Sequence, residues 1–295
     1  MVSEKYLEFF FHLLLFLCKD TKKSEKRKVK REKIIIFAPM NERSKISVVI
    51  NTYNAARFLR EVLESVKDFD EVLICDMEST DTTLDIAREY DCKIVTFPKA
   101  DHKSAEPART FAIQSAACHW VLVVDADEIV TPQLRACLYH HIQQENAAEG
   151  LYIPRLNKFM GKTMACAYPD YQLRFFIREG TEWPPYVHTF PRVNGRLDYL
   201  PKGQKELAFV HLANDTIHTI MEKDNRYSDN DVEKKAHKNY GAVALLWRPF
   251  WRFFKCYVLE GGWRDGVHGL IYAGLKGVYQ FELVAKIIEK RVKNE

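Results

Sequence analysis

The residues best suited to chemistry are three acids that follow an apolar run. Residues 119–132, HWVLVVDADEIVTP, predict a buried strand that ends at Asp125, Asp127 and Glu128. Acids there can simply begin a solvated loop, and Thr131-Pro132 is typical of a helix start. Side chains alternate along a strand, however, so Asp125 and Asp127 should point the same way and repel unless a positive charge lies between them. A hard divalent cation, Mg²⁺ or Mn²⁺, would supply that charge and commonly carries phosphates.

Alternating strands and helices must position these acids. Short apolar runs rich in β-branched residues predict four strands, at 46–50, 71–75, 93–97 and 120–124. A strand–helix–strand repeat of this length predicts right-handed crossovers and a parallel sheet.

Helices are expected between these strands. The first should follow an Asn54 cap and bury one face, made of Leu59, Val62, Leu63 and Val66. Ser79 or Thr80 is expected to cap the second helix. The third should run from about Glu106 to Cys118.

Polar residues follow three of the four strands, where parallel sheets bind ligands. They are Asn51, Thr52, Tyr53 and Asn54 after the first strand, Asp76 after the second, and Asp125 and Asp127 after the fourth. The loop after the first strand, NTYNAARF, contains no glycine. Its sequence therefore argues against a dinucleotide-binding dehydrogenase and against a P-loop ATPase.

Composition excludes several classes of protein. The 295-residue chain is 47% hydrophobic, and its net charge of +4 is concentrated in residues 19–33, which hold nine Lys or Arg and three acids. The remainder is slightly acidic, so no nucleic-acid binding is expected. Seven scattered cysteines without a C-x-x-C pair favour reduced thiols in the cytosol over disulfides or a zinc site.

The first 39 residues differ from the remainder. Residues 6–18, YLEFFFHLLLFLC, are apolar but too short to span a bilayer, and no cleavage site follows them. Two readings stay open: with its basic tail this segment lies on an anionic membrane surface, or translation starts at Met40.

Three motifs resemble the family 2 glycosyltransferases of the GT-A fold. They are SVVINTYNAARFLREVLESV, EVLICDMESTDTTLDIA and PARTFAIQSAACHWVLVVDADE, in the order and spacing of the family. Further on, AYPDYQLRFF, VHTF, FVHL, NRYS and GGWRDGVHG are similar to the branch that includes lipopolysaccharide core β-1,4-glucosyltransferases.

The resemblance implies an α/β fold of the GT-A type, a Rossmann-like, mostly parallel sheet flanked by helices, with a mixed acceptor-side region and C-terminal helices. It divides the chain into an N-terminal extension at 1–39, a nucleotide-sugar half at 40–150, an acceptor and catalytic half at 151–240, and amphipathic helices at 241–295.

The resemblance also implies a UDP-sugar donor, a bound Mg²⁺ or Mn²⁺ and a role for each matching residue. Donor-binding residues would be Thr52, Tyr53, Asn54 and Asp76 around uracil and ribose, Arg109 near base or phosphate, and Asp125 near the ribose. Thr110 stands where the family usually has asparagine. The metal would lie on Asp127, with His211 completing the metal or phosphate shell unless it is a buried structural histidine. Arg174 and His188 would serve the acceptor or phosphate side.

An inverting transfer needs a carboxylate to take the proton of the acceptor hydroxyl. Asp170, in PDYQLR, matches the expected acid, although Pro169-Asp170 is also an ordinary turn signal. Thr189 stands where the branch usually has a glutamate, and Glu182 is the substitute candidate.

Residues 245–259, LLWRPFWRFFKCYVL, mix aromatic side chains with Arg248, Arg252 and Lys255. Such stripes are usually core, but the basic residues and the absence of acids favour a helix on anionic lipid, which Pro249 should start or kink. A glycine-rich turn and a closing helix should follow.

Two functions are compared. The leading one is an inverting, metal-assisted transfer of a hexose, with glucose favoured, from a UDP-sugar to a lipid-linked or lipopolysaccharide acceptor. This enzyme would be cytoplasmic and peripheral on the inner face of the cell membrane. The alternative is a catalytically weak sugar-nucleotide-binding protein of the same fold.

Overall fold

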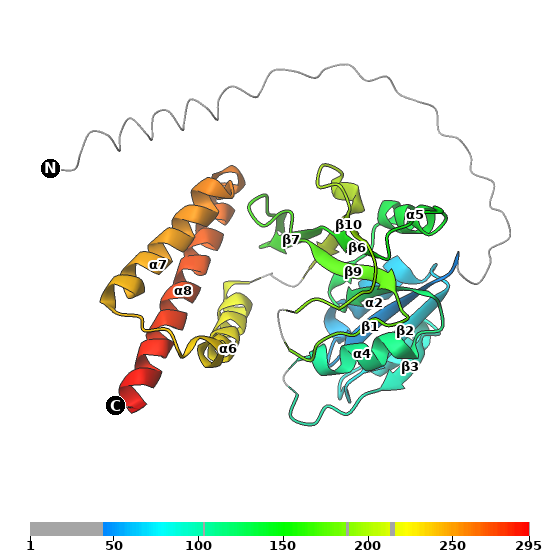
Figure 1. The fold of residues 1–295 in the computed structure, drawn as a ribbon, viewed down its shortest axis with the longest axis horizontal. Helices are drawn as coiled ribbons and strands as arrows, with labels where there is room; N and C mark the ends of the chain where they lie inside the picture. The colour runs from blue at the N-terminus through cyan, green and yellow to red at the C-terminus, as the bar shows by residue number, and fades with distance from the viewer. Residues whose placement is uncertain (1–43, 103, 187–188, 213–215, 295) are drawn as a thin grey trace, which may run out of the picture. The chain divides into compact units, whose positions relative to one another are not determined.

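The computed structural model describes residues 44–102, 104–186, 189–212 and 216–294 (Figure 1). The predicted extension at 1–39 and the predicted site residue His188 lie outside these ranges. The described residues belong to one compact unit of the chain.

Four parallel strands form the predicted half of the main sheet. They are β1 (Ile46–Thr52), β2 (Glu71–Asp76), β3 (Lys93–Thr96) and β4 (Trp120–Asp125), in the spatial order β3-β2-β1-β4. In this register Asn51 lies opposite Asp125, and Thr52 lies opposite Asp76. The carboxyl ends of the strands therefore meet at one edge of the sheet.

Later strands complete this sheet and form a smaller one. β9 (Gln172–Ile177) lies antiparallel to β4, followed by β6 (Gly150–Ile153) and β10 (Leu197–Tyr199). The smaller sheet has the order β5-β11-β7-β8, comprising β5 (Glu128–Ile129), β11 (Phe209–His211), β7 (Arg155–Phe159) and β8 (Lys162–Thr163). The mixed α/β fold is confirmed. The division near residue 150 stays a prediction, since both halves contribute to the main sheet.

Helices cover both faces of the main sheet. On one face pack α2 (Ala56–Val66), α3 (Thr83–Glu89) and α5 (Pro132–His141), and on the other packs α4 (Glu106–Ser115). The predicted apolar face of α2 is buried, and Thr131 caps α5 by accepting from the Leu134 N–H at 3.0 Å. α4 ends at Ser115, three residues before the predicted end.

The predicted helix caps at Asn54 and at Ser79 or Thr80 are wrong. α2 begins after Ala55 and α3 after Thr82, neither with a side-chain cap. Asn54 Oδ1 instead accepts from the Thr80 N–H at 2.8 Å, which links the loops after β1 and β2. The Asn54 and Ser79 side chains accept from backbone N–H groups of the neighbouring loop instead of capping their own helices.

The C-terminal part is helical. It contains α6 (Ile217–Lys235), α7 (Ala242–Phe254), a π-helical turn (Lys255–Leu259), a 3₁₀ turn (Gly262–Asp265) and α8 (Val267–Asn294). The predicted turn and closing helix are thus present, and α7 packs along α8 (Figure 1). Pro249 lies inside α7, so it does not start the helix. Within the described ranges, no helix combines the length and the apolar character needed to cross a membrane.

Candidate functional site

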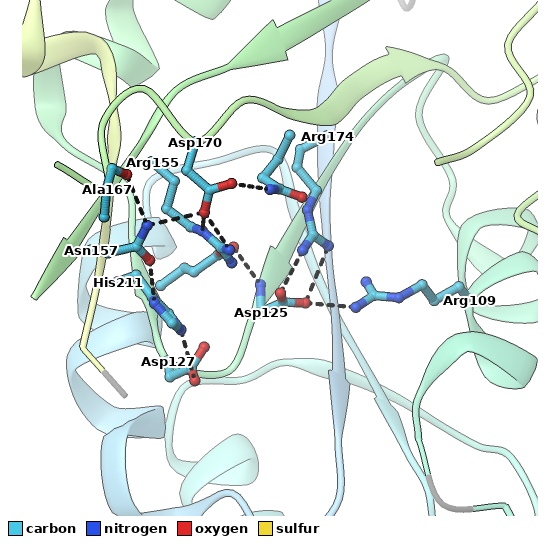
Figure 2. Close-up of polar contacts among 11 residues, drawn as sticks. Arg109, Asp125, Asp127, Arg155, Asn157, Ala167, Asp170, Arg174 and His211 are labelled. Carbon is cyan, nitrogen blue, oxygen red and sulfur yellow. Dashed lines mark hydrogen bonds and ion pairs between the residues drawn. The ribbon is translucent and has the colours of Figure 1, made fainter. Parts of the chain in front are cut away.

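A cavity of about 780 Å³ lies at the carboxyl ends of β1 and β4. Its lining includes Asn51, Arg109, Asp125, Asp127, Arg174 and Trp183. The sequence predicts a ligand at this edge. Seven predicted site residues line the cavity: Asn54, Arg109, Asp125, Asp127, Asp170, Arg174 and His211, most of them drawn in Figure 2.

Asp125 is held by two arginines from other elements. Arg109 Nη2 donates to Asp125 Oδ1 at 2.8 Å, and Arg174 binds both oxygens, with Nη1 at 3.1 Å from Oδ1. Burial raises the pKa of the Asp125 carboxyl, but Arg174 and Arg109 outweigh burial and hold that pKa well below its usual range. The chain itself therefore neutralises Asp125, and this carboxylate has no need of a bound cation.

Asp127 does not point the same way as Asp125, contrary to the alternation expected for a strand. β4 ends at Asp125, and Ala126 and Asp127 form a turn before β5. Asp127 Oδ2 lies 3.4 Å from His211 Nε2, on the other side of the turn from the arginines (Figure 2). Asp125 and Asp127 thus face different partners.

The role of His211 Nδ1 as a hydrogen-bond donor follows from its other neighbour. Asn157 Nδ2 donates to Asp170 Oδ2 at 3.0 Å and reaches the Ala167 carbonyl at 3.4 Å, so its amide oxygen must face His211. That oxygen lies 2.8 Å from His211 Nδ1, which therefore carries the hydrogen. A neutral His211 directs its Nε2 lone pair at the Asp127 carboxylate. Two acceptors at 3.4 Å need a proton or a cation between them.

Asp170 lies at the centre of a hydrogen-bond network. Its Oδ2 accepts from Arg155 Nε at 2.9 Å, from Arg155 Nη2 at 2.6 Å and from Asn157, whereas Oδ1 accepts from Gln172 Nε2 at 3.0 Å. Burial raises the pKa of Asp170, but Arg155 and these hydrogen bonds lower this pKa by more than burial raises it, so the net shift is downward. Arg155 also pairs with the fully buried Glu128 at 3.0 Å. Asp170 is therefore an ionised carboxylate, and its Oδ1 accepts fewer hydrogen bonds than its Oδ2.

Trp183 lines the cavity and was not predicted from the sequence. The guanidinium carbons of Arg109 and Arg174 lie 4.5 and 5.4 Å from its ring centroid. The Thr110 hydroxyl bonds both the N–H and the carbonyl of Trp183, at 2.9 and 3.0 Å. Thr110 therefore holds the ring against both arginines.

Buried polar atoms without a hydrogen-bond partner gather around this cavity. Among the described residues six side chains carry such atoms, and all but Arg248 line the cavity: Asn51, Glu106, Arg109, Arg174 and Trp183. Leaving buried polar groups unsatisfied costs free energy, so such groups usually meet a ligand or water. Their convergence indicates a polar ligand.

The predicted base-and-ribose residues form a closed network beside the cavity. Asp76 Oδ1 accepts from the hydroxyls of Thr52 and Ser79, at 2.8 and 2.6 Å, and Oδ2 accepts from the Ser79 N–H at 2.8 Å. Tyr53 is half exposed, with Lys99 Nζ 4.9 Å from its ring centroid. Of the group around β1 and β2, Asn54 lines the cavity, whereas Thr52, Tyr53 and Asp76 do not.

The substitute acid Glu182 does not reach the site. Its side chain is exposed, and its backbone bridges Arg192 through hydrogen bonds of 2.8 and 3.2 Å. Thr189 does line the cavity, but its hydroxyl donates to the Tyr186 and Pro184 carbonyls.

A second cavity, of about 910 Å³, adjoins the first. Residues of α6, α8 and the loop before β9 line it, among them Tyr168, Asp224, Tyr272 and Lys276. The residues common to both cavities are Arg155, Asp170, His211, Lys223 and Tyr227. Asp170 therefore faces both spaces.

Few of the described side chains at this site could bind a metal ion. No group of three or more His, Cys, Asp or Glu suited to a metal occurs among the described residues. Asp127 and His211 offer one oxygen and one nitrogen. Mg²⁺ and similar ions are commonly bound by one or two side chains together with substrate phosphates, so this pair fits such an ion.

The family match and the two relatives reported below are glycosyltransferases by name. Residues 47–179 match the family described as Glycosyl transferase family 2. An uncharacterized glycosyltransferase of Rickettsia felis is 25% identical over 264 residues, which cover 85% of this chain and 92% of the relative. The lipopolysaccharide core biosynthesis glycosyltransferase LpsC of Rhizobium meliloti is 23% identical over 263 residues, covering 83% and 92%. The solved structure of S. aureus TarS residues 1–349 aligns with a TM-score of 0.45 at 17% identity, covering 83% of this chain and 91% of that one.

Proposed function

Because residues 47–179 match the family described as Glycosyl transferase family 2, we propose that the chain transfers a hexose from a UDP-sugar with inversion. Glucose is the favoured sugar, and the acceptor is a lipid-linked or lipopolysaccharide glycan. The similarity to a lipopolysaccharide core glycosyltransferase supports this acceptor class.

The observation that carries the proposal is the convergence of unsatisfied buried polar atoms on the smaller cavity. Arg109 Nε and Nη1, Arg174 Nε and both polar atoms of Asn51 are donors or acceptors with no partner among the described residues. A nucleotide sugar supplies hydroxyls, phosphate oxygens and base edges to such groups. A volume of about 780 Å³ also lies within the ordinary range of small-ligand pockets.

Asp127 and His211 would hold the divalent ion. The hydrogen on His211 Nδ1 leaves Nε2 free to bind a cation beside the Asp127 carboxylate. The bound ion would offset charge on the diphosphate. Asp125 forms ion pairs with Arg109 and Arg174 instead of binding the ion. These ion pairs fix both arginines at the cavity wall.

Asp170 is the proposed base. The donor occupies the smaller cavity and the acceptor the larger one, so Asp170 lies where the two substrates meet. The acceptor hydroxyl oxygen bonds to C1 of the sugar, and its proton passes to Asp170 Oδ1. The bond between C1 and the diphosphate oxygen breaks, and its electron pair leaves with UDP. Arg155 and Asn157 hold Oδ2 and so fix the carboxylate during transfer.

The C-terminal helices would bring the enzyme to its acceptor. No side chain of α7 is buried, and Trp247, Phe250 and Trp251 are about half exposed and in ring contact. Arg252 and Leu259 belong to α7 and the turn after it, and both line the larger cavity. An anionic lipid surface on this aromatic face would place lipid-linked acceptors beside the cavity mouth.

A catalytically weak sugar-nucleotide-binding protein is the second candidate. Two observations favour it: Asp170 is a weak base because its pKa is lowered, and Thr189 occupies the position of the usual glutamate with its hydroxyl bound to backbone.

UDP release separates the two functions. Nucleotide sugars are first screened for Mn²⁺-dependent thermal stabilisation, which should select a UDP-hexose. Release of UDP from that donor is then measured with lipopolysaccharide-core and lipid-linked glycan acceptors. Turnover that depends on an acceptor supports the transferase. Stabilisation without turnover supports the binding protein, and absence of stabilisation by every nucleotide sugar contradicts both.

A further inference from the structure

Helix α6 brings cationic side chains to the smaller cavity. It contains the segment NRYS, residues 225–228, for which the sequence provided no role. Lys223, Arg226 and Tyr227 lie three and four positions apart, so they share one face of the helix, and all three line the smaller cavity. α6 thus forms a wall opposite the strand ends that carry Asp125.

Two of these side chains differ from Arg109, Arg155 and Arg174, three other cations of the cavity. Arg109 and Arg174 are paired with Asp125, and Arg155 with Asp170 and Glu128. Lys223 and Arg226, by contrast, make no ion pair with any residue in the described ranges.

Lys223 is the more enclosed of the two cations. Its Nζ lies 5.7 Å from the Tyr227 ring centroid. Burial lowers the pKa of Lys223, although Asp127 opposes this shift. Partial burial strengthens the attraction between this cation and an anion that enters the cavity.

We infer that Lys223 and Arg226 bind the diphosphate of the donor and stabilise it as it leaves. This inference rests on the proposed function, since it assumes a nucleotide diphosphate in the smaller cavity. Arg226 lines that cavity and not the larger one, which favours the nucleotide over the acceptor as its ligand. Lys223 lines both, at the junction where the sugar–phosphate bond breaks. Cations fixed at that point oppose the charge that develops on the departing oxygen.

The arrangement gives the site two sources of positive charge. The ion held by Asp127 and His211 would supply one, and Lys223 and Arg226 of α6 would supply the other. Because α6 belongs to the C-terminal part of the chain, donor binding would also link this helix to the main sheet.

The test compares UDP with uridine, which lacks the phosphates. Affinities are measured by titration calorimetry at one fixed Mn²⁺ concentration for the wild type, Lys223→Gln, Arg226→Gln and the double variant. Lys234→Gln is the matched control, because Lys234 lies exposed on the same helix and lines neither cavity. Each cavity variant should bind UDP about tenfold more weakly, the ordinary loss for one hydrogen bond to a charged group. Uridine affinity should not change, and the control should match the wild type for both ligands.

Every other outcome overturns the inference. UDP affinity equal to that of the wild type in the double variant shows that α6 does not bind the diphosphate. Equal losses for UDP and uridine show a structural defect, which thermal unfolding of the variants would also reveal. A wild type that binds no UDP overturns the proposed function together with the inference, whereas normal UDP binding in the double variant overturns the inference alone.

Discussion

The buried carboxylate of Asp265 accepts the backbone N–H of Ala165, a hundred residues earlier in the chain, at 2.9 and 3.0 Å. It also accepts the Cys166 N–H at 3.1 Å. Asp170 follows four residues after Cys166. The glycine-rich turn before α8 therefore holds the loop that leads to the proposed base, and it gives the closing helix a part in the site.

Asp265→Ala should disturb both stability and turnover. Losing hydrogen bonds to a buried charged acceptor costs about 1.5–3 kcal/mol of unfolding free energy, measurable by urea denaturation. The loop would also lose its anchor, so kcat should fall while UDP affinity stays near the wild-type value. Asp265→Asn retains one acceptor oxygen, so its stability and kcat should lie between those of Asp265→Ala and the wild type. A kcat equal to that of the wild type in Asp265→Ala would show that Asp170 is positioned without this anchor.

Asp127→Ala should abolish transfer and remove the Mn²⁺ dependence of UDP binding. The diphosphate would lose the ion that offsets its charge, because His211 alone is one ligand. Calorimetry with UDP, with and without Mn²⁺, checks this. Asp101→Asn, a change in an exposed turn, is the control. Unchanged turnover in Asp127→Ala would rule out the metal assignment.

Asp170→Asn should lower kcat by about a hundred- to ten-thousand-fold, the usual worth of general-base catalysis. The amide keeps the size of the side chain but cannot take the acceptor proton. UDP-sugar affinity should barely move, because the base addresses the acceptor. Acceptor-dependent UDP release gives kcat, and calorimetry gives the affinity.

Glu182→Gln is the control for the base, and its effect should be small because the side chain is exposed outside both cavities. If Glu182→Gln is inactive and Asp170→Asn is active, the base assignment is wrong. If neither change matters, Thr189→Glu should raise activity, as expected for a degenerate enzyme.

The strands and the acids at their ends could be predicted because both are local patterns. Strands β1 to β4 are short apolar runs, and parallel pairing then requires that Asn51 and Asp125 meet. Side-chain partners between loops could not be predicted. Asn54 and Thr80 bond each other across 26 residues, a pairing that spacing does not specify.

The rest of the site comes from short or irregular segments. Arg155 and Asn157 lie on the five-residue strand β7, which is too short for its periodicity to be distinctive. Trp183 reaches Thr110 across 73 residues, and Lys223 reaches the cavity from α6. Such contacts depend on tertiary packing, and so the sequence motifs located the acids together with Arg109 and Arg174, but not Arg155, Lys223 and the Trp183 ring.

Acid should destabilise the protein through Asp125 and Asp170, whose pKa values are both lowered in the folded state. Their contribution is complete above the ordinary aspartate pKa of about 3.9 and is lost as pH falls through the lowered folded pKa values. Urea midpoints measured from pH 7 to pH 3 should therefore be nearly constant above pH 5 and fall below about pH 4. In Asp170→Asn the fall should be smaller. Parallel profiles for the variant and the wild type would show that Asp170 is not stabilised by Arg155.

The dependence of kcat on pH in the acidic range follows from the lowered pKa of Asp170. Because Asp170 stays ionised, kcat should show no loss attributable to this base between pH 5 and pH 8. A rate that halves near pH 6 would point to another titrating group as the base.

The aromatic face of α7 should bind anionic membranes. Protein lacking residues 1–39 should keep its activity if Met40 is the true start, and it should sediment in part with phosphatidylserine vesicles. High salt should release it, because charges on the vesicle surface are screened. Trp247→Ser together with Trp251→Ser should abolish sedimentation without lowering turnover on a water-soluble acceptor, since neither side chain lines a cavity. The control is Trp263→Ser, a similarly exposed tryptophan outside α7, which should still sediment. If the truncated protein stays in the supernatant at low salt, the aromatic face covers something other than lipid.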